Sequence, residues 1–368
     1  MIKQATSLQE VKALPVTHAE NFPVASWLCP PHLRPAIAAI YAFARAADDM
    51  ADEGEEGPGQ RLDALKAFRQ ELMHGPSLEC AHPEIFIPLH QVIQSFNLPV
   101  QYLNDLLKAF EQDVQATAQA SKPKSIEELL QYCQLSANPV GRLLLHLYGV
   151  NDDEALRRSD AICSALQLIN FWQDLSVDIP RGRIYLPAEL QAMHGVSEAE
   201  LLAQATSPAT RALVADCVEQ ARRLMLEGAP LVHQVPGRAG WELRLVVQGG
   251  LRIAERIALL DFATLRQRPV IGRSDMDKLQ GKGNYQNYDA HIVPVVPADS
   301  SNPRELNYFP CEAASLSPPF PGFTYMELVL FESAQVIRSH ASLSPPHPPQ
   351  VLPCFVVHVA RSRIPRPL

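Results

Sequence analysis

Apolar side chains recur at intervals of three and four residues from about Pro31 to Pro269, and Gly and Pro interrupt the pattern. This spacing puts the apolar side chains on one face of an α-helix, whereas a half-buried strand would alternate at every second residue. The sequence therefore predicts an all-α fold. The expected helices cover residues 33–53, 60–74, 84–96, 100–117, 126–148, 153–179, 209–235 and 241–267, with shorter helical turns at 19–27 and 188–193.

Two of the expected helices, around Ala36 and Ala161, are apolar over much of their circumference, which is typical of central helices. Each carries a ladder of oxygen donors, because residues four apart lie about 40° apart around a helix axis. The first ladder, in "YAFARAADDMADE", is Asp48, Asp49 and Asp52, and the second ladder, in "QLINFWQDLSVDIPRGRIYLP", is Asn170, Asp174 and Asp178. Asp49 points about 100° away from Asp48, so we expect it to support the ligands rather than to be one.

Two oxygen-donor ladders on central helices indicate a magnesium-diphosphate site. Proteins usually hold Mg²⁺ with one or two carboxylates and the phosphates of a substrate. Because diphosphate and the ladders are all anionic, metal and cationic side chains must lie between them. Arg45, Arg181 and Arg183 are placed to supply positive charge, and with Tyr185 the last two can close over a leaving diphosphate.

Simpler interpretations also fit parts of this pattern. A charged helix end explains the first ladder alone equally well, since acidic turns are common. The second ladder is harder to explain in that way, because Asn170 and Asp174 lie in an apolar run where unpaired polar groups are costly to bury. Arg181 and Arg183 can instead neutralise the C-terminal end of their helix.

Other side chains have alternatives too. Taken singly, the following aromatic residues fit a core better than the wall of a carbocation cavity: Phe22, Tyr41, Tyr132, Phe171 and Trp172. Two ExxH pairs, Glu71 with His74 and Glu79 with His82, lie too close together in sequence for the facing helices of a di-iron site. Gly249 and Gly250 fit a close helix contact, and no nucleotide-loop, HExxH or GxSxG motif is present.

Composition narrows the class of protein. The 368 residues are 47% hydrophobic and carry a formal net charge of -8, which fits a large soluble enzyme and argues against nucleic acid as a partner. Seven scattered cysteines without a CxxC pair favour a reducing, cytoplasmic compartment. The sequence shows no signal peptide and no apolar run of membrane-spanning length.

The character of the chain changes after about residue 279, because 14 of the 32 prolines follow Ala290 and the helical period fades. We therefore divide the chain into an all-α domain at 1–278 and a Pro-rich tail at 279–368 that we expect to lack a fixed structure. The abrupt change near Met276 also leads to the hypothesis that the tail is read in a shifted frame, which would remove a closing helix and reduce activity. If neither other frame of the DNA encodes an apolar helical continuation, this hypothesis is wrong.

Between about Asn21 and Gly272 the chain resembles the squalene and phytoene synthases, which are head-to-head isoprenyl diphosphate enzymes. The resemblance rests on "YAFARAADDMADE", "YCQLSANPVGRLLL" and "LINFWQDLSVDIPRGRIYLP". It implies an isoprenoid synthase helical bundle with a central cavity and a Mg²⁺-bound diphosphate. The runs "AENFPVASWLCP" and "NFWQD" are most similar to the hopanoid-pathway branch called HpnC. That branch forms hydroxysqualene from presqualene diphosphate by capture with water and without nicotinamide.

The resemblance also assigns roles by position. The implied Mg²⁺ ligands are Asp48, Asp52, Asn170, Asp174 and Asp178. The implied catalytic residues are Tyr41, Arg45, Gln167, Arg183 and Tyr185, and the implied substrate-binding residues are Phe22, Tyr132, Val140, Gly141 and Phe171. Gln173 stands where many relatives have Arg, so one diphosphate-facing charge is missing or comes from elsewhere.

Two other functions stay open at this point. The first is condensation of farnesyl diphosphate to presqualene diphosphate, or to squalene with NADPH. The second is a non-catalytic assembly or lipid-binding relative, which would have no reason to keep all five ligands. The expected partners are an isoprenoid diphosphate, other hopanoid-pathway enzymes and, peripherally, the inner face of a membrane. The sequence fixes neither the product nor the oligomeric state.

Overall fold

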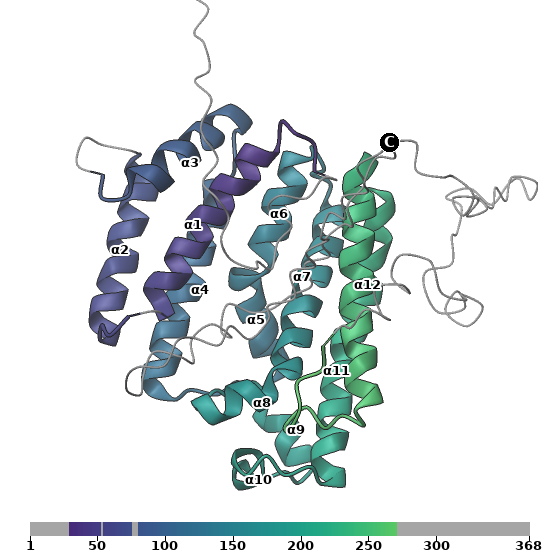
Figure 1. Cartoon of the computed structure of the whole chain (residues 1–368). Coiled ribbons are helices and arrows are strands. Elements are labelled where there is room, and N and C mark those ends of the chain that lie inside the picture. The colour runs from purple at the N-terminus through teal and green to yellow at the C-terminus, as the bar shows by residue number, and fades with distance from the viewer. Residues whose placement is uncertain (1–28, 53, 76–79, 271–368) are drawn as a thin grey trace, which may run out of the picture.

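The computed structural model describes residues 29–52, 54–75 and 80–270, and every regular element within them is a helix (Figure 1), which confirms the all-α class. The longer helices are α1 (Arg34–Asp52), α2 (Pro58–His74), α3 (Pro83–Phe96), α4 (Val100–Gln119), α5 (Ile126–Ser136), α6 (Asn138–Leu147), α7 (Asp153–Gln173), α11 (Pro208–Gly228) and α12 (Gly237–Leu259). The short ones are α8 (Leu175–Asp178), η1 (Ile179–Arg181), α9 (Ala188–Met193), α10 (Glu198–Leu202) and η2 (Ala229–His233).

Local sequence explains where several helices begin. Ser125, Asp152 and Ser207 precede α5, α7 and α11, and the side-chain oxygen of each accepts a hydrogen bond from the backbone N–H three residues further on. Such caps satisfy donors that have no partner within the helix. The predicted short helix at 188–193 is confirmed with the same bounds as α9.

The helix predicted at 126–148 is wrong as one element, because the chain forms two helices there. Ala137 lies between α5 and α6 with φ −117° and ψ −49°, and α6 restarts at Asn138 with Pro139 in its first turn. Proline has no N–H and is tolerated at a helix start but not in a helix interior. The regular apolar spacing across this point therefore hid a real boundary.

The helix predicted at 153–179 also ends early. α7 stops at Gln173, and Asp174 has φ −96° and ψ 9°, outside the helical range. The carbonyl of Asp174 then accepts hydrogen bonds from the N–H groups of Val177 and Asp178, at 2.8 and 2.9 Å, which starts the short helix α8. The middle of the second ladder is thus the capping residue of α7 rather than a residue inside a continuous helix.

The last two predicted helices have different bounds as well. The helix expected at 209–235 ends as α11 at Gly228, and the chain tightens into the 3-10 helix η2, which contains Pro230. The helix expected at 241–267 begins earlier and ends at Leu259, where Asp261 and Phe262 adopt positive φ values of 52° and 56°. This left-handed pair ends the helix and redirects the chain toward α7.

Two hydrophobic cores organise the bundle. One core is built mainly by α5, α7, α11 and α12 around the fully buried Trp172. The other is built by α1 to α4 and α6, where Phe43, Phe68 and Phe86 pack with ring centroids 4.7 to 6.1 Å apart. In Figure 1 the purple and blue helices α1 to α4 lie on one side and the green helices α11 and α12 on the other, with α5, α6 and α7 between them. The two ladders therefore belong to different cores.

Gly250 on α12 confirms the prediction of a close helix contact. A Cβ atom added to Gly250 would lie 2.6 Å from Met225 Cε and 2.9 Å from Leu166 Cδ2, closer than carbon atoms approach in folded proteins. A larger residue would force the ends of the Met225 and Leu166 side chains to move, so glycine suits this close approach of α12 to α7 and α11. None of the described helices is both long enough and apolar enough to cross a membrane. The predicted tail, the domain boundary at 278, the helical turn at 19–27 and Phe22 lie outside the described residues.

Candidate active site

The first ladder lies on α1 and remains partly open to solvent. Arg45 Nη1 is 3.2 Å from Asp48 Oδ2, and Arg45 Nη2 is 2.7 Å from Asp49 Oδ1. The side chains of Arg45 and Asp48 are 20% exposed, and that of Asp49 is 39% exposed. Tyr41 lies one turn before Arg45 and is partly buried. One guanidinium thus holds two aspartates of the first ladder.

The second ladder is buried. Asn170, Asp174 and Asp178 are only 4%, 1% and 1% exposed, and Gln167 lies one turn before Asn170 in a partly buried position. The amide oxygen Oδ1 of Asn170 has no hydrogen-bond partner among the described residues. A buried acceptor without a donor or a cation is costly. This oxygen therefore indicates a position where a cation or donor from outside the described residues would be favourable.

The negative charge of Asp174 acts on the carboxylate of Asp178. Burial, followed by the charge of Asp174, raises the pKa of Asp178 from 3.8 to about 7. Arg183, Arg181 and Arg268 act in the opposite direction, because positive charge favours the ionised carboxylate. The site therefore keeps two acidic groups close together, and a bound cation would stabilise both in their charged form.

Arg183 joins the two ladders. Its Nη2 atom lies 3.7 Å from Oδ1 of Asp52, the last residue of α1. Gly182 has φ +78°, a conformation that favours glycine, and this turn lets the N–H of Arg183 bond to the carbonyl of Asp178 at 3.0 Å. The Arg183 guanidinium is thus directed at another helix, which goes beyond neutralising its own helix end. Arg181 lies on η1, and its positive charge acts on Asp178.

Three aromatic rings from separate elements form a layer beside this junction. The rings of Phe171 and Tyr185 stack with centroids 4.0 Å apart and an interplanar angle of 10°. Tyr132 on α5 packs against Phe171 at 6.1 Å and 36°. Phe171 is 3% exposed and Trp172 is fully buried, so both are also core residues, as the simpler interpretation expected.

Asp113 on α4 is a site residue that the sequence analysis missed. Its Oδ2 atom accepts a hydrogen bond of 2.9 Å from the Tyr132 hydroxyl. Burial raises the pKa of Asp113 to about 7, Tyr132 and Arg183 oppose the shift, and Asp48 adds to it. The sequence contains a weak signal for Asp113. It follows Phe110 by one helical turn and so lies on a face of α4 that otherwise carries apolar side chains, where a carboxylate is unexpected.

Arg268 is a second residue that was missed. The segment after α12 returns to the end of α7, where Arg268 Nε lies 2.5 Å from Asp174 Oδ1. Next to it, the amide nitrogen of Gln173 donates to the carbonyl of Pro269 at 2.8 Å. Gln173 stands at the position where many relatives have Arg. Arg268 thus brings a positive charge close to that position. No local pattern could reveal a contact between residues 94 apart in sequence.

Val140 and Gly141 lie on α6, where it packs against α7. A Cβ atom added to Gly141 would collide with Ser159 Oγ and Cys163 Sγ of α7. Packing therefore already favours glycine at this position, because a side chain would force Ser159 and Cys163 to move. The roles of Val140 and Gly141 in substrate binding stay predictions.

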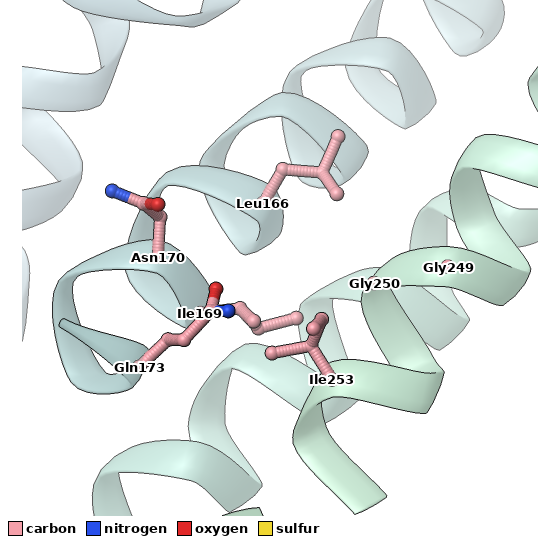
Figure 2. Close-up of a pocket in the computed structure, with 7 residues that line it drawn as sticks. All are labelled: Leu166, Ile169, Asn170, Gln173, Gly249, Gly250 and Ile253. Carbon is pink, nitrogen blue, oxygen red and sulfur yellow. The ribbon is translucent and has the colours of Figure 1, made fainter. Parts of the chain in front are cut away.

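A small pocket lies between α7 and α12 beside the second ladder (Figure 2). Its volume is about 10 Å³, room for about one water molecule. The residues that line it are Leu166, Ile169, Asn170, Gln173, Gly249, Gly250 and Ile253. In Figure 2 Leu166, Ile169 and Gln173 extend from α7 toward α12, where the two glycines lie. A central cavity for a whole isoprenoid chain stays a prediction.

The oxygen donors of the second ladder match Mg²⁺ in chemical type. Among the described residues, no three His, Cys, Asp or Glu side chains lie close enough together to bind one metal ion. Mg²⁺ commonly takes only one or two carboxylates and completes its shell with water and phosphate oxygens. The buried carboxylates of Asp174 and Asp178 and the unsatisfied oxygen of Asn170 are donors of the right chemical type. The second ladder therefore fits Mg²⁺ that is bound together with a diphosphate.

Known proteins match this chain over most of the described residues. The squalene/phytoene synthase family matches residues 16–275. A hydroxysqualene synthase from Rhodopseudomonas palustris is 31% identical over 258 residues, 70% of this chain and 85% of the relative. A phytoene synthase from Thermus thermophilus is 31% identical over 252 residues, 68% of this chain and 83% of the relative. The crystal structure of squalene synthase HpnC from Alicyclobacillus acidocaldarius aligns with a TM-score of 0.61 and 36% identity, over 67% of this chain and 90% of that chain.

Proposed function

Because the chain belongs to the squalene/phytoene synthase family of isoprenoid enzymes, we propose that it converts presqualene diphosphate to hydroxysqualene and releases diphosphate. Relatives named hydroxysqualene synthase and HpnC support this choice of reaction. A phytoene synthase is equally similar by identity. The choice of product therefore rests on the site residues and on direct measurement.

The observation that carries the proposal is the contact between Arg183 and Asp52. At 3.7 Å it joins the end of α1 to the segment that follows the second ladder. Two sets of oxygen donors and three guanidiniums, those of Arg45, Arg183 and Arg268, thereby gather around one region. Acidic groups bind a metal cation and basic groups bind diphosphate, so this combination suits Mg²⁺ and diphosphate bound together better than it suits either of them alone.

In this proposal Asp48 and Asp52 on α1 and Asn170, Asp174 and Asp178 of the second ladder would hold Mg²⁺. When bound, Mg²⁺ neutralises charge on the diphosphate and makes it a better leaving group. Arg45 and Arg183 would bind diphosphate oxygens through charge-assisted hydrogen bonds. In the described structure both guanidiniums contact aspartates, so diphosphate binding would exchange some of these contacts.

The aromatic layer would stabilise the cation formed when the carbon–oxygen bond to diphosphate breaks. Tyr132, Phe171 and Tyr185 present ring faces, which attract positive charge, and their apolar surroundings limit the access of water. The cyclopropylcarbinyl cation then rearranges with opening of its ring, and the oxygen of one water molecule forms a bond to the cationic carbon of the rearranged chain. The proton that this oxygen loses passes to the released diphosphate, so that atoms and charge balance and no reductant is required.

The test is turnover of presqualene diphosphate by the purified chain with Mg²⁺ in ¹⁸O-labelled water and without nicotinamide. We expect diphosphate release together with hydroxysqualene that carries the label. Asp174→Ala should lower the rate by about 100- to 1000-fold, because the buried ladder would lose a carboxylate. Asp153→Ala, an exposed residue in the first turn of the same helix, is the matched control and should keep the wild-type rate.

Other outcomes lead to other functions. Diphosphate release from farnesyl diphosphate but not from presqualene diphosphate would assign the condensation reaction instead. A dependence of product formation on NADPH would assign squalene synthesis. If neither substrate reacts while both are bound, a non-catalytic lipid-binding role would replace the enzymatic one.

A further inference from the structure

The carboxylate of Asp113 is placed to control one hydroxyl group in the aromatic layer. It lies on α4, while the Tyr132 hydroxyl that it binds at 2.9 Å comes from α5. The charged groups that act on Asp113 are Arg183, which attracts its negative charge, and Asp48, which repels it. The Asp113 carboxylate thus contacts the aromatic layer, and it is also subject to the charges of Asp48 on α1 and of Arg183 after the second ladder.

This contact sets the direction of the Tyr132 hydroxyl. A tyrosine hydroxyl has one hydrogen to donate, and here it is donated to Asp113. Any group that approaches the hydroxyl from its other side therefore meets oxygen lone pairs and not a hydrogen. A hydrogen bond to a carboxylate also increases the electron density on that oxygen. Both effects favour the stabilisation of positive charge near the ring.

We propose that Asp113 is a positioning residue that holds the Tyr132 hydroxyl with its oxygen lone pairs, and not its hydrogen, toward the reacting cation. The inference rests on the proposed function, because it requires a cation beside the aromatic layer. Asp113 acts through Tyr132, whose ring contacts Phe171, and Phe171 in turn stacks on Tyr185. The same carboxylate is attracted by the charge of Arg183, the guanidinium that contacts Asp52.

The experiment is a double-mutant cycle on Asp113→Asn and Tyr132→Phe, measured on the rate constant of diphosphate release at saturating substrate. Each single variant should lose about 10- to 100-fold, the usual effect of a charge-assisted hydrogen bond. The double variant should lose no more than the larger single loss, because Asp113 has nothing to position once the hydroxyl is gone. The Michaelis constant should change much less than the rate constant.

Asp105→Asn is the matched control, since it makes the same chemical change on the same helix. The Asp105 carboxylate binds Gln101 and Lys108 and is expected to leave the rate at the wild-type value. Thermal unfolding of all variants separates positioning from folding. If Asp113→Asn does not fold, Asp113→Glu takes its place in the cycle, because it keeps the charge and displaces the carboxylate by one methylene.

Multiplicative losses in the double variant, or a wild-type rate in Asp113→Asn, would overturn the inference. Diphosphate release is measured whichever isoprenoid product forms. A product other than hydroxysqualene therefore overturns only the proposed function. If the wild type releases no diphosphate from either substrate, the proposed function fails. Because the inference requires the cation that forms when diphosphate leaves, this outcome overturns the inference as well.

Discussion

The two acidic ladders share the same four-residue spacing but lie in opposite environments. On α1, Asp48 and Asp49 are 20% and 39% exposed and both contact Arg45 of their own helix. In the second ladder, Asp174 and Asp178 are 1% exposed, and the cation at Asp174 is Arg268, from a segment 94 residues away. Asp48 and Asp49 of the first ladder are thus balanced by their own helix, whereas Asp174 of the second ladder depends on the tertiary structure for its contact with Arg268.

This difference changes what each carboxylate contributes. Exposed ion pairs are screened by water and contribute little to stability. A buried carboxylate is unfavourable unless a cation or donors compensate it, and this same property lets a buried site bind metal and diphosphate strongly. The second ladder is therefore where we expect function and stability to conflict.

The largest effect that we expect comes from removing a cation from each ladder in turn. Arg268→Ala removes a guanidinium that contacts the buried carboxylate of Asp174 and should lower the free energy of unfolding by about 3–5 kcal/mol. Arg45→Ala should lower it by less than about 1 kcal/mol, because its partners are partly solvated. Urea denaturation of both variants measures the difference. Equal losses would show that the two ladders do not differ in electrostatic environment.

The second prediction concerns pH. The pKa of Asp178 is about 7 in the folded chain and 3.8 as its ordinary value, so the folded state binds the proton more tightly. Stability from this group is therefore fully present below pH 4 and is lost as pH rises through 7. Asp178→Asn should raise Tm at pH 8 by roughly 3–8 °C and should have almost no effect at pH 4.

Differential scanning fluorimetry at both pH values tests this prediction. Asp153→Asn, at an exposed position in the first turn of α7, is the control, and its effect on Tm should not depend on pH. An increase in Tm of the same size at pH 4 would mean that the substitution stabilises the fold for a reason other than the charge of Asp178.

A third and smaller effect is expected at Gln173, which anchors the segment that carries Arg268. Gln173→Leu leaves the buried carbonyl of Pro269 without its donor and should destabilise the chain by about 1–3 kcal/mol. Because the anchored segment also holds Arg268, the effects of Gln173→Leu and Arg268→Ala should not add. Gln134→Leu, at an exposed position of α5, is the control. Additive losses would contradict a shared anchoring role.

The smallest effect should come from Asp49. Its side chain is the most exposed in the first ladder, and it contacts Arg45 rather than the junction with Arg183. Asp49→Asn should change the rate of diphosphate release by less than about threefold, whereas Asp52→Asn should lower it much more. Steady-state measurement of the rate of diphosphate release in the two variants tests this difference. A large loss in Asp49→Asn would place this carboxylate among the ligands instead of beside them.

Much of the fold could be predicted from the sequence because helical periodicity is a local property. The bounds of α9 and the start of α4 agree with the prediction, and Gly250 was recognised as a small residue at a helix contact. The boundaries within 126–148 and 153–179 were wrong, because apolar spacing continues across both breaks. At Asp174 the break depends on a backbone conformation that the spacing of side chains does not encode.

The sequence by itself determined the two ladders, the residues that form them and the all-α scaffold, because residues four apart on one helix have a nearly fixed relation. Only the tertiary structure decided which ladder is buried and how Arg183, Arg268 and Asp113 meet them. The contacts of Arg183 with Asp52, of Arg268 with Asp174 and of Asp113 with Tyr132 join segments that are distant in sequence, and their geometry follows from how the helices and the segments that follow them pack together. The spacing of donors along a helix is a local property, whereas their burial, pKa values and partners depend on the whole fold.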